Sequence, residues 1–139
     1  MPANTTPIFI LNGNFTPGRI AAANTASDGS GALVTIVTAG SNGTRVDGVR
    51  FINSQVTAAA AAAKVWRIFL SDTGGANPRI IGEVIAAAVT RSTTVAGQTA
   101  TYTFDQPIIM KSGQIMTVVQ SVYTTAADQT DACAFAGDY

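Results

Sequence analysis

The sequence predicts an all-β fold, a β-sandwich or barrel of about eight or nine mainly antiparallel strands. Short segments rich in β-branched and aromatic residues recur along the chain, with Gly, Asn, Asp and Pro between them, which is typical of such folds. One segment alternates strictly between apolar and polar residues, and no long amphipathic helix pattern is present. A chain of 139 residues is enough for one domain. We therefore expect a single domain over residues 1–139.

Nine segments are expected to form strands. In chain order they cover residues 7–11, 32–38, 45–53, 64–70, 79–86, 99–104, 108–110, 115–125 and 133–136. Residues 99–104 place Ala100, Tyr102 and Phe104 on one face and three threonines on the other, the pattern of a half-buried strand. Residues 115–125 are rich in β-branched side chains, which favours a strand that is apolar on both faces.

The segment 45–53 breaks strict alternation. Val46 has one parity and Val49 and Phe51 have the other, with Gly48 between them. A β-bulge at Gly48 would turn all three side chains toward the core, because one extra residue reverses the alternation. A strand with mixed faces and no bulge is the alternative.

Residues 64–70 and 79–86 are expected to form an antiparallel hairpin. The intervening residues 71–78 are dense in turn formers, and Gly74-Gly75 would be its flexible tip rather than a phosphate loop, which needs a following Lys. The register in which residue numbers sum to 150 pairs Arg67 with Glu83, the only Glu in the chain. Opposite charges in a cross-strand pair weakly favour this register. In that arrangement Trp66, Ile68 and Leu70 share one face, as do Ile80, Gly82 and Val84.

Six consecutive alanines make residues 57–63 the exception to the strand pattern. Alanine has the highest helix propensity, yet seven residues are too few to hold a helix by propensity alone. The segment is expected to be either a short helical turn or an irregular loop.

The composition argues against an enzyme. The chain contains no His and one Cys, and only 12% of its residues are charged. Without His there is no Ser-His-Asp or Cys-His machinery and no His-based zinc site. The best carboxylate pair for glycoside hydrolysis is Glu83 with Asp105 or with Asp72, and nothing in the spacing requires them to meet. We expect no catalytic residues, no metal and no cofactor.

Structural roles are expected for three further candidate sites. Residues 128–131 lack the carboxylate density of a calcium loop and are expected to form a turn. Cys133 is flanked by alanines and is expected to be a small buried residue. Trp66 shares its face with apolar neighbours, which favours the core over a sugar-stacking platform.

The balance of charges limits the classes of partner that the chain is expected to bind. Eight basic and eight acidic residues give a formal net charge of zero, without a basic run, so nucleic acid is not expected as a ligand. No apolar stretch approaches the ~20 residues of a membrane span, and the first residues lack the features of a secretory signal. We expect no membrane partner, and assembly in the cytoplasm.

Several stretches resemble a family of small tailed-phage virion proteins that accompany the major capsid protein. They are residues 22–31 (AANTASDGSG), 38–47 (TAGSNGTRVD), 67–70 (RIFL), 81–84 (IGEV) and 136–139 (AGDY). The resemblance covers most of the chain, and its motifs are turns and strands rather than catalytic groups. The alanine run departs from the pattern.

The resemblance implies a jelly-roll-like β-sandwich that acts as a capsid cement, or decoration, protein. Such a protein forms a homo-oligomer, a dimer or a trimer, on the outside of the virion shell of a bacteriophage. There it clamps neighbouring major capsid subunits. The motifs define no functional residues, so none is carried over.

An N-terminal arm is the predicted contact with a neighbour. Pro2 and Pro7 favour extended backbone, and Ile8, Phe9 and Ile10 supply apolar contacts. We expect residues 1–11 to lie on a neighbouring subunit, with Tyr139 as a further interface residue. The alternative is an ordinary first strand within its own sheet.

Sparse charge is compatible with a cement role, because interface cores are depleted of charged residues. The alternative function is the receptor-binding knob of a tail or head fibre that recognises host surface glycans. Such a knob should carry clustered exposed aromatics and a stalk, and the chain has few aromatics and no stalk. A small carbohydrate-active enzyme would need acid and base groups that are lacking.

Overall fold

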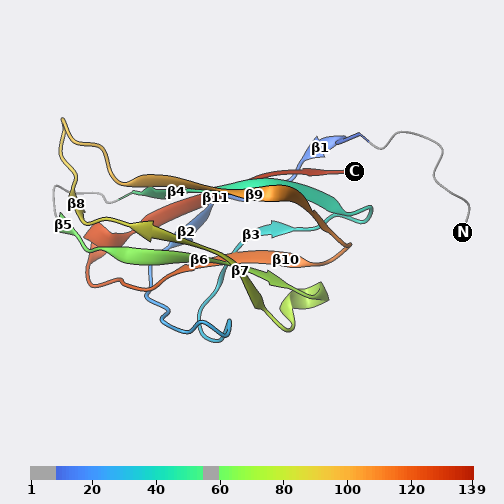
Figure 1. The fold of residues 1–139 in the computed structure, drawn as a ribbon, viewed down its shortest axis with the longest axis horizontal. Helices are drawn as coiled ribbons and strands as arrows, with labels where there is room; N and C mark the ends of the chain where they lie inside the picture. The colour runs from blue at the N-terminus through green and yellow to red at the C-terminus, as the bar shows by residue number, and fades with distance from the viewer. Residues whose placement is uncertain (1–8, 55–59) are drawn as a thin grey trace, which may run out of the picture.

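The computed structural model describes residues 9–54 and 60–139, and it is all-β, as the sequence predicts. Two antiparallel sheets lie face to face and form a β-sandwich (Figure 1). Sheet A contains β1 (Asn12–Gly13), β2 (Gly18–Ile20), β11 (Thr130–Asp138), β4 (Thr44–Asn53) and β9 (Thr99–Met110). Sheet B contains β3 (Val34–Thr38), β10 (Ile115–Gln120), β6 (Lys64–Ser71) and β7 (Arg79–Ala86). A separate short pair joins β5 (Ala60–Ala61) to β8 (Val89–Thr90).

The strand pairs are nested along the chain. The strand β2 pairs with β11, β3 with β10, β4 with β9, and β6 with β7, so partners are found progressively closer together in sequence. Successive main strands mostly alternate between sheets, since β2, β4, β9 and β11 belong to sheet A and β3, β6, β7 and β10 to sheet B. The single core between the two sheets therefore depends on contacts between residues that are far apart in sequence.

The core lies between the inward faces of the two sheets. Trp66 of β6 and Phe51 of β4 are both fully buried and stack across it, with ring centroids 5.1 Å apart and an interplanar angle of 6°. The indole Nε1 of Trp66 donates to Thr130 Oγ1 at 3.1 Å, which satisfies the one polar atom of that side chain. The expected core position of Trp66 is confirmed.

The predicted bulge in residues 45–53 is present. Val46 pairs with Ala136 and Gly48 with Phe135, so Asp47 is the extra residue of β4. Val46, Val49 and Phe51 are all fully buried, and the alternative without a bulge is wrong. A Cβ at Gly48 would lie 2.6 Å from the carbonyl oxygen of Tyr102, so the strand β9 approaches this glycine too closely for a side chain.

The predicted hairpin is present, and its predicted register is confirmed for the first half of β6. Lys64 to Ile68 pair with β7 in the expected register, and Arg67 Nε lies 2.8 Å from Glu83 Oε1. A register shift then pairs Phe69 with Ile80. For this reason Ile81 packs on the core with Val84, and the expectation that Ile80 shares a face with Val84 is wrong: Ile80 is 40% exposed.

Several predicted boundaries change. The segments 99–104 and 108–110 belong to one strand, β9, and its first half alternates between exposed threonines and half-buried apolar residues as expected. The strand predicted for 115–125 ends at Gln120, and those predicted for 32–38 and 133–136 correspond to β3 and β11. Residues 9–11 are not a strand, and residues 7 and 8 lie outside the described part of the chain.

The alanine run is described from Ala60 onward. Ala60 and Ala61 form the short strand β5, so both expected alternatives, a helical turn and an irregular loop, are wrong for these two residues. Ala61 is buried, and its pairing with Val89 outweighs the intrinsic preference of alanine for helix.

We predict that Gly48→Ala lowers the free energy of unfolding by about 1–3 kcal/mol, because the new methyl group forces β4 and β9 apart. Gly13→Ala is the matched control, since a Cβ there meets only ordinary contacts with Phe15, at 3.6 Å. Urea denaturation of both variants measures the difference. Equal costs for the two variants would contradict the close approach at the bulge.

Candidate functional site

Most of the predicted interface residues are available at the surface. Phe9 is 70% exposed and Ile10 46% exposed, and Tyr139 is half-buried. Ile8 lies outside the described residues. No described contact assigns these side chains to a neighbour, so the interface stays a prediction.

The structure places both described ends of the chain at one end of sheet A (Figure 1). The backbone N–H of Leu11 donates to the carbonyl of Asp138 at 2.8 Å, and β1 then pairs with the end of β11. The N–H of Tyr139 donates to the carbonyl of Gly43 at 3.2 Å. Residues 11–13 are therefore hydrogen-bonded to their own sheet, while Phe9 and Ile10 expose apolar side chains beside it. The expected contact of residues 1–11 with a neighbouring subunit stays a prediction, and residues 1–8 lie outside the described part of the chain.

A group of four exposed apolar side chains lies on the outward face of sheet A at this end. We call it the outer-face patch and define it as Ile10, Phe15, Ile109 and Phe135, which are between 46% and 58% exposed. Gly13 and Gly137 are paired neighbours on this face, and the side chains of Phe15 and Ile10 lie over them. Because glycine leaves the sheet surface bare, two apolar side chains from the beginning of the chain fill that space.

Sequence reasoning missed three of the four patch residues. Phe15 lies between strands, and its position over Gly13 depends on pairing with β11, far away in sequence. The position of Ile109 was predictable from the sequence, because alternation within residues 108–110 places its side chain on the other face of the strand from the inward Ile108 and Met110. Phe135 points outward because the inward Ala134 is its neighbour.

Two ion pairs lie on the same face. Arg45 Nη2 lies 2.7 Å from Asp47 Oδ1, and Arg19 Nε lies 2.9 Å from Asp131 Oδ1. A partner covering this face would meet these two ion pairs together with Arg50, which is exposed opposite Cys133 and forms no salt bridge among the described residues.

A polar cluster fixes the same end of the sheet. Asn14 Nδ2 donates to Asp138 Oδ1 at 2.6 Å and to the carbonyl of Thr38 at 2.8 Å, and the Thr44 hydroxyl also donates to Asp138. Burial acts to raise the pKa of Asp138, but the hydrogen bonds from Thr44 and Asn14 outweigh it and hold that pKa below its ordinary value. The carboxylate connects β4 and β11 to the segment after β1.

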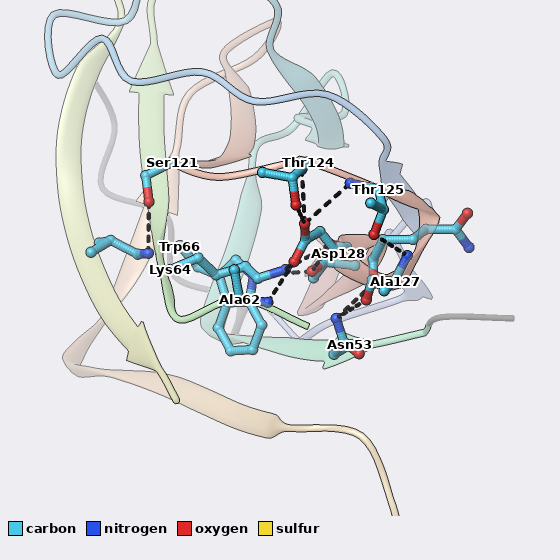
Figure 2. A network of polar contacts seen from close by, with 12 residues as sticks. Asn53, Ala62, Lys64, Trp66, Ser121, Thr124, Thr125, Ala127 and Asp128 are labelled. Carbon is cyan, nitrogen blue, oxygen red and sulfur yellow. Dashed lines mark hydrogen bonds and ion pairs between the residues drawn. The ribbon is translucent and has the colours of Figure 1, made fainter. Parts of the chain in front are cut away.

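The most strongly perturbed titratable group lies in a buried cluster (Figure 2), beside β5 at the end of the sandwich opposite the C-terminus (Figure 1). Lys64 Nζ lies 3.1 Å from Asp128 Oδ1, and both side chains are buried, with exposures of 1% and 0%. The same ammonium group donates to the carbonyl of Asp128 at 2.8 Å. Asp128 Oδ1 also accepts from the N–H of Ala62 at 2.8 Å, and Oδ2 accepts from the N–H and hydroxyl of Thr124 at 2.8 and 2.7 Å.

These hydrogen-bond donors favour the charged form of the Asp128 carboxyl. Burial acts to raise the pKa of Asp128, but the hydrogen bonds from Thr124, Ala62 and Lys64 outweigh it and hold that pKa far below its ordinary value. Burial lowers the pKa of Lys64, while the hydrogen bond and charge of Asp128 oppose the shift. Both carboxylate oxygens are occupied by donors of the chain itself. The cluster therefore serves structure rather than proton transfer to a ligand.

The turn expected for residues 128–131 lies earlier in the chain, because Thr130 and Asp131 already belong to β11. Asp128 ends a 3-10 turn (Ala126–Asp128), whose first N–H groups are capped by Thr125. The sequence indicated a turn but not that its Asp is fully buried against a lysine 64 positions earlier.

The other candidate residues are not brought into a reactive arrangement. Glu83 is held by Arg67, Asp72 accepts from Asn77 Nδ2 at 3.1 Å at the hairpin tip, and Asp105 is exposed on β9. Cys133 is a free, half-buried thiol whose pKa burial raises, which makes it less reactive. Gly74-Gly75 forms a 3-10 turn (Thr73–Gly75) at the tip, where both residues have positive φ.

Two shallow hollows lie at the surface: one of about 320 Å³ lies beside Pro17 and Asp131, and one of about 290 Å³ lies beside the hairpin tip. The lining residues of the second are Leu70, Ser71, Asp72, Asn77, Arg79, Ile81 and Gln114. Within residues 9–54 and 60–139, no group of three or more His, Cys, Asp and Glu side chains is placed to hold a metal ion. In the same residues, no helix has the length and apolar character to cross a membrane.

Comparison of the chain with protein-family models, with curated proteins and with solved structures finds no match.

We predict that Lys64→Met lowers the free energy of unfolding by about 3–5 kcal/mol, because it leaves the Asp128 carboxylate buried without its counter-charge. Arg67→Met is the control: it breaks the ion pair with Glu83, which is 51% exposed, and should cost about 1 kcal/mol. Urea denaturation compares the two. A cost for Lys64→Met no larger than that of the control would show that the buried pair does not stabilise the fold.

The low pKa of Asp128 also predicts a loss of stability in acid. The folded protein binds the proton of this carboxyl less well than the unfolded chain, whose Asp pKa is about 3.9. Its stabilisation is therefore complete at neutral pH and decreases as the pH falls below about 5. Asp128→Asn should be less stable than wild type at pH 7, and the difference should shrink toward pH 3. Unfolding curves over this range measure it, and a constant difference would contradict the assignment.

Proposed function

We propose that the chain is a structural virion protein of a tailed bacteriophage, a capsid cement or decoration protein. In this proposal it binds the outside of the shell, clamps neighbouring major capsid subunits and acts through binding, without catalysis or a cofactor. Its location is the outer capsid surface, after assembly in the host cytoplasm, and neither nucleic acid nor membrane is a partner.

The fold supports a jelly-roll-like arrangement as part of this proposal. Four nested antiparallel pairs, from β2–β11 outside to β6–β7 inside, are what results when one long hairpin wraps into two sheets. The stretches that resemble phage virion proteins fall on this framework, since 67–70 and 81–84 lie in β6 and β7.

The outer-face patch is the observation that carries the proposal. It places exposed apolar side chains on a rigid sheet, with the exposed Phe9 next to Ile10 in sequence and two ion pairs on the same face. Aromatic residues surrounded by polar groups are typical of the centre of protein interfaces. We assign this face, together with Tyr139, to contact with the major capsid protein.

The copy number in purified particles tests the proposal. Quantitative mass spectrometry should find this chain at a ratio near that of the major capsid protein. A ratio lower by an order of magnitude or more would contradict a cement role and favour the knob of a fibre.

A variant tests the assigned face. Phe135→Ser should reduce binding to shells that lack the protein by about tenfold, equivalent to ~1.4 kcal/mol of binding free energy. Ile85→Ser is the matched control, because Ile85 is 81% exposed on sheet B, away from the patch. Equal shell binding by both variants would contradict the assignment of this face.

A further inference from the structure

The two long sides of the sandwich differ in how they are closed. On one side, the N–H of Thr16 donates to the carbonyl of Ile36 at 2.9 Å, and Gly18 packs closely against Val34. The chain itself therefore covers the border between β2 and β3. On the other side lie the end strands β7 and β9, and no described strand pairs with their outer edges.

The hydrophobic core reaches the surface along this second side. Four inward residues of β9 pack on the core but stay partly exposed: Ala100, Tyr102, Phe104 and Ile108. The inward residues of the adjacent β4 are fully buried. Ile81 and Val84 of β7 are likewise only partly buried. This side of the core is thus less covered than the rest.

The backbone of β9 offers free hydrogen-bonding groups on this side. Asn53 N–H donates to the carbonyl of Gln98 at 2.8 Å, which fixes the alternation along the antiparallel pair. Ala100 and Tyr102 therefore direct their N–H and C=O groups toward β4. Thr99, Thr101 and Thr103 direct theirs away from the sheet.

Only half of this edge is protected against pairing. Lysines, prolines and bulges commonly block exposed edges. In β9, residues 104–107 lie opposite a single residue of β4, and Pro107 is among them. Residues 99–103 carry no charge and no proline and keep regular register with β4.

We propose that a second copy of this chain pairs with β9 in antiparallel fashion, about a two-fold axis at Thr101. This register places Thr99 opposite Thr103 of the second copy on the outward face, and Thr–Thr pairs are favourable across strands. On the inward face it places Ala100 opposite Tyr102 of the second copy. A small side chain thus meets a large one, so the edge is complementary to itself.

The size of this side fits a stable dimer. Twelve residues of β9 span about 40 Å at ~3.4 Å per residue, and two sheets ~10 Å apart with their side chains are about 20 Å wide. The side therefore offers on the order of 800 Å² per copy, the area of a standard interface. A short peptide strand from another protein would cover one sheet edge and leave β7 open.

The proposed axis also has a consequence that rests on the cement function. A two-fold axis perpendicular to the sheets turns the outward faces of both copies of sheet A to the same side. One dimer would then present two outer-face patches to the shell, as a clamp between two subunits requires.

Analytical ultracentrifugation of the free protein tests the dimer without any shell. Thr101→Pro removes one edge N–H that β4 does not use, and proline is tolerated at such positions. We expect a dimer for wild type and for the control Thr101→Val, and a dissociation constant at least tenfold higher for Thr101→Pro with an unchanged circular dichroism spectrum. A monomeric or trimeric wild type would overturn the proposal, as would wild-type affinity in Thr101→Pro.

Amide hydrogen exchange of the wild type keeps the test valid if Thr101→Pro does not fold. The amides of Thr99, Thr101 and Thr103 should be protected at high protein concentration and lose protection on dilution. Fast exchange of all three at every concentration would overturn the proposal. Because neither measurement involves capsid, their failure is distinguishable from failure of shell binding.

Discussion

The sandwich depends on a buried ion pair that fixes its two sheets against each other. Lys64 opens β6 of sheet B, and Asp128 ends the turn that leads into β11 of sheet A. Two residues further along each strand, Trp66 donates to Thr130. Because side chains two apart share a face of a strand, these two contacts together set the position of β6 relative to β11. An isolated buried charge is costly, so the pair strongly disfavours any arrangement that separates these strands.

Local patterns in the sequence predicted much of the fold. The alternation in residues 99–104, the parity change at Gly48 and the charge pair between Arg67 and Glu83 each predicted a strand, a bulge or a register that the structure contains. Each of these signals concerns neighbours in sequence or a single hairpin. The shift after Ile68 has no such signal, which is why Ile81 rather than Ile80 faces the core.

The residues that sequence reasoning missed depend on contacts between distant segments. Asp128 lies in a stretch typical of a solvated turn, and only its meeting with Lys64 shows that it is buried. The outer-face patch likewise forms because the beginning and end of the chain pair, which brings Ile10 over Gly137. The low charge content predicted a surface suited to being covered by a partner, but it did not predict which face of the protein this is. The structure brings exposed apolar residues together on sheet A and leaves the core partly open along β9.

We propose that this chain acts as a structural element of a virion, spread over the shell and held by its faces and edges. Cryo-electron microscopy of intact particles is the most direct measurement. The account predicts density for a two-layered β-sandwich repeated over the outer shell, with the outward face of sheet A against the major capsid protein. Density for the chain confined to a fibre tip, with a bare shell, would contradict it.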